Sequence, residues 1–186
     1  EGWTEDSLDE IRALAGDERV VAIGEIGLDY YWDKTFAERQ KQMFRAQIEL
    51  ALELDLPVIV HDREAHGDCL EIVRDYPTLR GVFHCFSGSV EMAKELIRRG
   101  WYLGFDGPIT YKNAVRALEV LREIPIERIL LETDSPYLAP VPNRGKRNDS
   151  TNLPYIAAVV AREKNMELAE VAAQTMKNGK RLFCIR

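Results

Sequence analysis

The sequence predicts an α/β fold built on a parallel sheet, arranged either as a doubly wound sheet or as a barrel. Short apolar and β-branched runs recur along the chain, and longer segments of helical periodicity lie between them. Each run is apolar nearly throughout, which is typical of parallel strands that are covered on both faces. The length of 186 residues suits a single domain, and we expect residues 1–186 to form it.

Five apolar runs are expected to form the strands, in residues 20–27, 57–61, 81–86, 101–105 and 129–134. Thr35 and Glu38 form a capping-box pattern ahead of one helix, and Ser89 is placed to cap another that ends before Gly100. Further stripes with helical spacing predict helices in residues 114–121, 153–164 and 166–177. No glycine-rich phosphate-binding loop follows any of the five runs.

The composition argues against two classes of protein, those that coat nucleic acid and those that span a membrane. The formal net charge of −6 and the pI of about 5.2 argue against a protein that coats nucleic acid by charge alone. The net charge and the pI are compatible with an enzyme that binds a few phosphates in a local pocket. No apolar run approaches the roughly 20 residues of a membrane span, so we expect no membrane partner. Cys69, Cys85 and Cys184 form no CxxC pair, and we expect reduced thiols and a cytoplasmic location.

Residues that bind metals stand at or near the ends of four runs: Glu25, His61, His84 and Asp134. Each alone has a structural explanation, as a hydrogen-bonded histidine, a turn cap or a helix cap. In an α/β barrel, however, the carboxyl ends of all strands meet at one face. We therefore expect a shared metal site, whose imidazole and carboxylate donors suit zinc, manganese, iron or magnesium. Two ions about 4 Å apart, bridged by one carboxylate, activate water for attack on a phosphodiester.

Four motifs contain the candidate ligands: Gly-Glu-Ile-Gly-Leu-Asp (24–29), Val-Ile-Val-His-Asp-Arg (58–63), Phe-His-Cys-Phe-Ser-Gly (83–88) and Leu-Glu-Thr-Asp-Ser-Pro (131–136). Together they resemble the motifs of the TatD family of metal-dependent deoxyribonucleases. The segment 138–148 is also similar to its counterpart in the family, and the resemblance runs along the whole chain. It implies a (β/α)8 barrel of TIM-barrel type and metal-dependent hydrolysis of DNA, typically from the 3′ end.

The resemblance also implies a role for each of these residues. Glu25 is expected to bridge the two ions, and His61 and His84 to complete one metal site. Asp134 is expected to bind the other ion and to orient or deprotonate the attacking water. The intact protein would hold two divalent ions, of magnesium, manganese or zinc. Basic residues are candidates for substrate phosphate contacts, with a solvated loop as the alternative: Arg63, Arg144, Lys146 and Arg147.

One departure from the family pattern is a missing His-x-His pair on the first strand. The histidines here are His61, His66 and His84, with His66 expected to be a surface or supporting residue. We therefore expect an N-terminally truncated, incomplete barrel of about the last five βα units, with the first three strands absent and the activity impaired. Its exposed strand edges would favour self-association. Cys85 is expected in the core, because side chains alternate along a strand.

Two other functions remain open. A barrel of this kind also hosts hydrolases that act on a small ester, lactone or amide, and fold alone does not decide between substrates. The truncated chain is also compatible with an inactive or scaffolding remnant.

Overall fold

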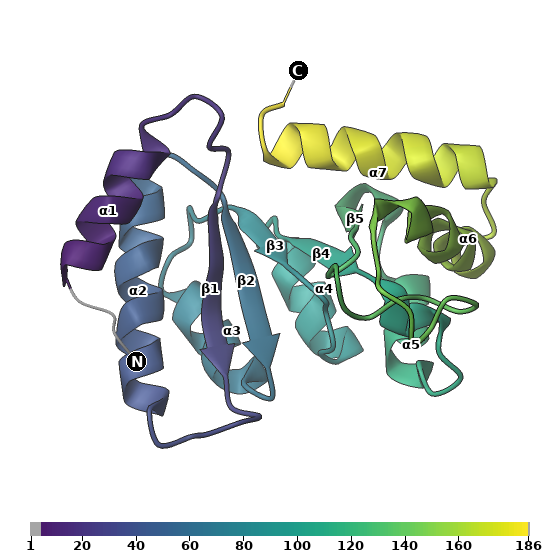
Figure 1. Cartoon of the computed structure of the whole chain (residues 1–186), viewed down its shortest axis with the longest axis horizontal. Coiled ribbons are helices and arrows are strands. Elements are labelled where there is room, and N and C mark those ends of the chain that lie inside the picture. Colours follow the sequence, from purple (N-terminus) through teal and green to yellow (C-terminus); the bar gives the residue numbers. More distant parts are fainter. Residues whose placement is uncertain (1–4, 186) are drawn as a thin grey trace. The chain divides into compact units, whose positions relative to one another are not determined.

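The computed structural model describes residues 5–185, and these form two compact units (Figure 1). The first unit runs to Val82 and also includes the chain from Leu182 onward, and the second spans Phe83–Arg181. The expected single domain stays a prediction, and each unit is described by itself. None of the described helices is long and apolar enough to cross a membrane.

The first unit pairs two strands and covers them with helices. Its elements are α1 (Glu5–Ala15), β1 (Ile23–Asp29), α2 (Ala37–Glu53), β2 (Val58–Arg63), α3 (His66–Arg74) and the start of β3 (Gly81–Phe83). β1 pairs with β2 in parallel, and α2 packs along β1 (Figure 1). Leu28 of β1 and Phe44 and Ile48 of α2 are fully buried and form the centre of this core.

The second unit continues the alternation of strands and helices. After the end of β3 it contains α4 (Val90–Arg98), β4 (Tyr102–Phe105), α5 (Val115–Glu123), β5 (Ile129–Leu131), α6 (Leu153–Lys164) and most of α7 (Leu168–Leu182), with short 3₁₀ helices at Gly107–Thr110, Ile126–Arg128 and Ser150–Asn152. β4 and β5 pair in parallel. Asn178 of α7 donates hydrogen bonds to the carbonyls of Ile126 and Ile129, both at 2.8 Å, which holds α7 against the start of β5.

The strand order in the sheet is β1-β2-β3-β4-β5, the order of the sequence. A strand lies at each of the five expected positions, so the α/β fold with a parallel sheet is confirmed. The strand boundaries differ: β1 begins three residues later than expected, and β3 ends at Phe83 rather than at residue 86. The helix expected over residues 153–164 has those bounds in α6.

Of the two expected helix caps, one is confirmed and one is wrong. Ser89 precedes α4, and its hydroxyl accepts a hydrogen bond from the amide of Met92 at 3.3 Å. The capping box at Thr35 and Glu38 does not form, because α2 begins only at Ala37 and Phe36 occupies the N-cap position without a side-chain bond. The amide of Thr35 instead donates to the carboxylate of Asp33 at 2.7 Å, which makes a local turn before the helix.

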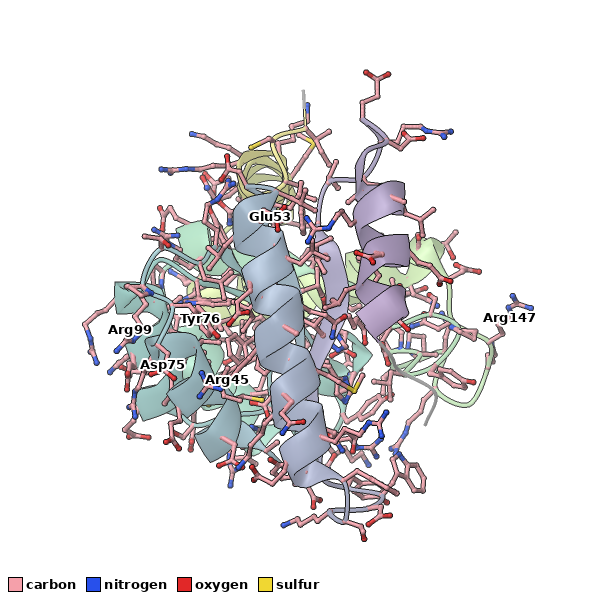
Figure 2. All side chains as sticks on the ribbon, turned by 90° about the vertical axis from the view of Figure 1, so that its left-hand side faces the viewer. Arg45, Glu53, Asp75, Tyr76, Arg99 and Arg147 are labelled. Atoms are coloured by element: carbon pink, nitrogen blue, oxygen red, sulfur yellow. The ribbon has the colours of Figure 1, made fainter. Side chains whose placement is uncertain are left out.

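Polar contacts on the surface tie α2 to the end of α3. Arg45 of α2 pairs with Asp75 at 2.7 Å, and its guanidinium lies 6.0 Å from the ring centroid of Tyr76 (Figure 2). The Tyr76 hydroxyl donates to Glu49 at 3.1 Å. Exposed pairs of this kind contribute at most about 1 kcal/mol each. Together they orient the two helices that follow β1 and β2.

We propose that the two outer strands of this sheet take part in self-association. β1 and β5 stand at the ends of the strand order of the described chain, and an outer strand presents unpaired amide and carbonyl groups. Sedimentation velocity over a range of protein concentrations is expected to show a sedimentation coefficient that rises with concentration. A single monomeric species at every concentration would contradict this proposal.

Candidate metal centre

A β-bulge in β1 sets the position of Glu25. Gly24 is opposite Ile59 and Ile26 is opposite Val60, so Glu25 is the extra residue between two consecutive partners. A bulge of this kind redirects a side chain away from the regular alternation of a strand. The Glu25 side chain is 52% exposed and faces His61 of β2.

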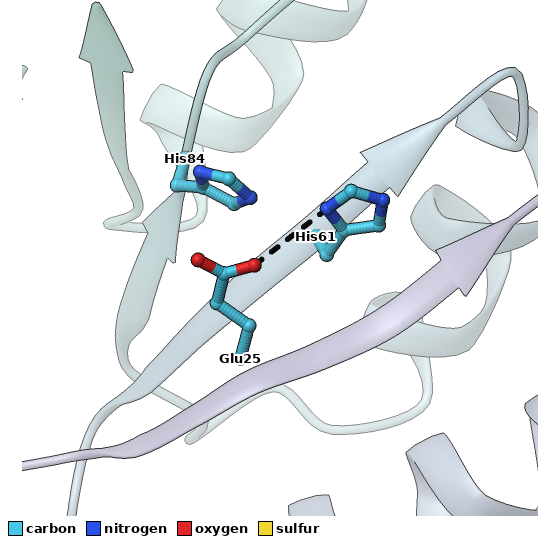
Figure 3. Close-up of side chains that lie close together, drawn as sticks. All are labelled: Glu25, His61 and His84. Carbon is cyan, nitrogen blue, oxygen red and sulfur yellow. Dashed lines mark ion pairs between the residues drawn. The ribbon is translucent and has the colours of Figure 1, made fainter. Parts of the chain in front are cut away.

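His61 lies near the carboxyl end of β2 with a carboxylate at each ring nitrogen. Its Nδ1 is 3.8 Å from Oε2 of Glu25 (Figure 3), and its Nε2 is 3.1 Å from Oδ2 of Asp29. Gly27 of β1 is opposite His61 and has a φ of +140°. A Cβ atom there would stand 2.0 Å from the carbonyl oxygen of His61, so only glycine allows the two strands this approach.

Asp29 is held in place from several directions. Its amide donates to the Gln40 side chain at 2.8 Å, and the Gln40 amide group donates back to the Asp29 carbonyl at 3.0 Å. Its second carboxylate oxygen accepts a hydrogen bond from the amide of Tyr31 at 2.9 Å. Helix α2 therefore fixes the end of β1, and Asp29 in turn orients His61. This role of Asp29 was not predicted from the sequence, although Asp29 closes the motif at residues 24–29.

The side chains named above share a pocket. It is lined by Glu25, Ile26, Gly27, Asp29, Gln40 and His61, all in the first unit. The structure thus brings two expected site residues, Glu25 and His61, together at the carboxyl ends of neighbouring parallel strands.

His84, in the second unit, directly follows β3 and also has a carboxylate beside its ring. It is 8% exposed, and its Nδ1 is 3.9 Å from Oε1 of Glu132. The same oxygen accepts a hydrogen bond from the amide of Cys85. Gly104 of β4 leaves room for this carboxylate, since a Cβ there would meet Glu132 Oε1 at 2.6 Å. The position of Glu132 beside His84 was likewise not predicted from the sequence.

The expected core position of Cys85 is wrong. β3 ends at Phe83, and Cys85 has a left-handed φ of 44°, so the alternation of a strand does not extend to it. Its side chain is half-buried and lines a pocket together with Asp106. Burial raises the pKa of the Cys85 thiol, and nearby Asp106 raises it further, so the thiol is protonated at neutral pH.

Asp134 lies three residues beyond β5, half-buried and with a φ of 53°. Its charge acts on Asp106, which is only 2% exposed. Oδ2 of Asp106 has no hydrogen-bond partner among the described residues. Desolvation is the main cause that raises the pKa of Asp106 to about 6, with the charge of Asp134 adding to it and a hydrogen bond with Cys85 opposing it.

Replacing Asp106 is expected to change how stability depends on pH. The pKa of Asp106 is higher in the folded than in the unfolded chain, so the protonated form favours folding. This contribution to the free energy of unfolding is complete below the unfolded pKa of about 4 and is lost as pH rises through about 6. Asp106→Asn should therefore raise the free energy of unfolding by about 3 kcal/mol at pH 8 and leave it nearly unchanged at pH 4. Urea denaturation in EDTA at both pH values measures this difference. Equal effects at the two pH values would contradict it.

The candidate phosphate ligands are distributed over both units. Arg63 ends β2, in the same unit as Glu25 and His61. The other three follow Asp134 in the second unit: the guanidinium of Arg144 lies 4.3 Å from the ring centroid of Tyr111, Lys146 donates to Asn143 at 3.3 Å, and Arg147 extends outward from its loop (Figure 2).

His66 begins α3, and its Nδ1 is 2.8 Å from Oδ2 of Asp62. Its role as a surface or supporting residue stays a prediction.

Comparisons with known proteins agree on one family. The family model described as TatD related DNase matches residues 1–184. An uncharacterized metal-dependent hydrolase from Bacillus subtilis, YabD, is 47% identical over 184 residues, which is 98% of this chain and 72% of the relative. A Cronobacter sakazakii protein named 3′-5′ ssDNA/RNA exonuclease TatD is 41% identical over 191 residues, with 97% of this chain and 72% of the relative covered.

Solved structures of the same family have the same fold. The TatD homologue YjjV from Escherichia coli matches with a TM-score of 0.91 and 31% identity over 99% of this chain and 72% of its own. A TatD family hydrolase from Entamoeba histolytica matches with a TM-score of 0.84 and 28% identity, over 98% of this chain and 70% of its own. These matches do not confirm the expected truncation or the incomplete barrel.

Proposed function

We propose that this chain, which belongs to the TatD family of metal-dependent hydrolases, hydrolyses phosphodiester bonds of single-stranded DNA from the 3′ end. The observation that carries the proposal is the pairing of Glu25 with His61, with Asp29 behind the imidazole, at the carboxyl ends of two parallel strands. A relative that is 41% identical is named as an exonuclease of single-stranded DNA and RNA, which supports the choice of substrate.

The donor set fits a divalent ion. The 3.8 Å between His61 Nδ1 and Glu25 Oε2 is too long for a hydrogen bond, but it suits two donors that each stand about 2.1 Å from one ion. The other ring nitrogen of His61 faces Asp29, and a carboxylate in that position is typical behind a metal-bound histidine. We therefore assign Glu25 and His61 as ligands.

We propose His84, which directly follows β3, as a third ligand of the same ion, as the resemblance of the motif at residues 83–88 to the family implies. Glu132 stands behind His84 as Asp29 stands behind His61. The two histidines thus have the same kind of supporting carboxylate.

The bound ion would lower the pKa of a water molecule and polarise the scissile phosphodiester. Asp134 is proposed to orient or deprotonate that water and to bind a second ion in proteins with the full ligand set. This chain has three histidines and no His-x-His pair, so we propose one weakly bound ion of magnesium, manganese or zinc and slow cleavage. Arg63, Arg144, Lys146 and Arg147 are proposed to contact substrate phosphates, and a cytoplasmic location is proposed from the three free cysteines.

The experiment that tests this function follows DNA cleavage and metal binding together. Single-stranded oligonucleotides labelled at the 5′ end are incubated with the chain and Mg²⁺, Mn²⁺ or Zn²⁺. We expect a ladder that shortens from the 3′ end and stops in EDTA. Hydrolysis of a nitrophenyl ester or a lactone without DNA cleavage would instead support a small-molecule hydrolase. Absence of both metal binding and cleavage would support an inactive remnant.

A further inference from the structure

We propose that Tyr31, Trp32 and Arg63 form a platform on which a base of single-stranded DNA stacks beside the metal centre. This inference rests on the proposed function and extends it to how the substrate is held. The three residues belong to the first unit, where β1 and β2 end. They are called the stacking platform below.

The stacking platform joins two exposed rings to one cation. The rings of Tyr31 and Trp32 meet edge to face, with centroids 4.8 Å apart and an interplanar angle of 88°. The guanidinium of Arg63 lies 3.9 Å from the Tyr31 centroid and 5.5 Å from the Trp32 centroid. Tyr31 is 49% exposed and Trp32 is 78% exposed. A large aromatic surface with a fixed positive charge is therefore open to solvent.

The platform is attached directly to the candidate metal ligands. One carboxylate oxygen of Asp29 accepts a hydrogen bond from the amide of Tyr31, and the other faces Nε2 of His61. Arg63 follows His61 by two residues on β2, so the two side chains lie on the same face of that strand. The amide of Tyr30 donates to the carbonyl of Arg63 at 2.9 Å, which keeps the loop after β1 beside β2. A substrate phosphate at His61 would place an adjoining base within reach of the platform.

The chemistry of the platform selects its occupant. Aromatic faces next to an arginine are the means by which proteins hold unpaired bases, because every base has a π-face and is linked to a negative phosphate. A second cation, Lys34, lies 5.6 Å from the ring centroid of Tyr30 in the same loop. Arg63 and Lys34 thus provide local positive charge in a chain whose net charge is −6. Paired bases hide their faces in the duplex, so the occupant is an unpaired base.

The test compares binding of two oligonucleotides in EDTA, where no cleavage occurs. One is an ordinary labelled single strand, and the other has the same phosphates but abasic sugars. Fluorescence anisotropy should show that the native chain binds the ordinary strand more tightly. Trp32→Ala should reduce this preference by about 5- to 150-fold, the range that corresponds to 1–3 kcal/mol per stacked base. Tyr155→Ala, at a tyrosine that is 42% exposed on α6, serves as the matched control and should keep the preference.

The outcomes separate this proposal from the proposed function. A native chain that cuts single-stranded DNA but binds both oligonucleotides equally would overturn the platform and leave the function standing. A base preference that Trp32→Ala removes, in a chain that cuts no DNA, would support the platform and refute the function. If Trp32→Ala changes the sedimentation coefficient rather than the base preference, the rings form a contact between copies of the chain, and the platform is overturned.

Discussion

Glu25→Gln is expected to slow hydrolysis of single-stranded DNA by about a thousandfold and to weaken divalent metal binding in parallel. The substitution keeps the size of the side chain but removes the negative charge that faces His61 across 3.8 Å. A thousandfold loss corresponds to about 4 kcal/mol of transition-state stabilisation, which is within the contribution of a metal ion to phosphodiester cleavage. Cleavage rates and isothermal titration with Mn²⁺ measure the two effects.

The matched control for this variant is Glu18→Gln, which makes the same chemical change at an exposed residue ahead of β1. It should leave both metal binding and cleavage at the native level. If Glu25→Gln bound Mn²⁺ as tightly as the native chain, Glu25 would not be a ligand, and the bulge in β1 would have no role in the site.

Asp29→Asn is expected to reduce metal affinity by about 10- to 100-fold, although Asp29 itself does not touch the ion. The native carboxylate of Asp29 lies 3.1 Å from Nε2 of His61 and favours the tautomer with its proton on Nε2, in which the lone pair of Nδ1 can bind the metal. An asparagine amide group would donate to Nε2 and favour the tautomer with its proton on Nδ1, on the side of Glu25. Asp29 is thus a positioning residue, and its effect should be visible in the dissociation constant of Mn²⁺ and not only in the rate.

Asp33→Asn is the matched control for Asp29→Asn, because Asp33 lies four residues later and accepts a backbone hydrogen bond from Thr35 in the loop. It is exposed and should bind Mn²⁺ with native affinity. Equal affinities for Asp29→Asn and the native chain would show that the ring orientation of His61 does not depend on this carboxylate.

The sequence predicted the α/β fold and the helix of residues 153–164 because apolar periodicity is a local property. It did not predict how the strands end. The bulge at Glu25 depends on the register between β1 and β2, and nothing in the local pattern of residues 81–86 indicated the left-handed backbone at Cys85. The capping box at Thr35 failed for a related reason, since Asp33 competes for the same backbone amide.

The candidate ligands were predictable, whereas their supporting residues were not. A histidine at a strand end is visible in one sequence, but the partner of its second ring nitrogen depends on which strand lies beside it and in what register. The supporting roles of Asp29 and Glu132 follow only from the structure, in which Asp29 lies beside His61 and Glu132 lies beside His84. The exposure of Trp32 is likewise a property of the folded loop and not of its sequence.

The measurement that tests the central claim most directly is a crystal structure of the chain grown with Mn²⁺, with anomalous diffraction recorded at the manganese edge. We expect a single strong anomalous peak bound by Glu25, His61 and His84. An ion bound elsewhere with these three side chains unliganded, or side chains that point apart in crystals with saturating Mn²⁺, would contradict the metal centre and the hydrolytic function built on it.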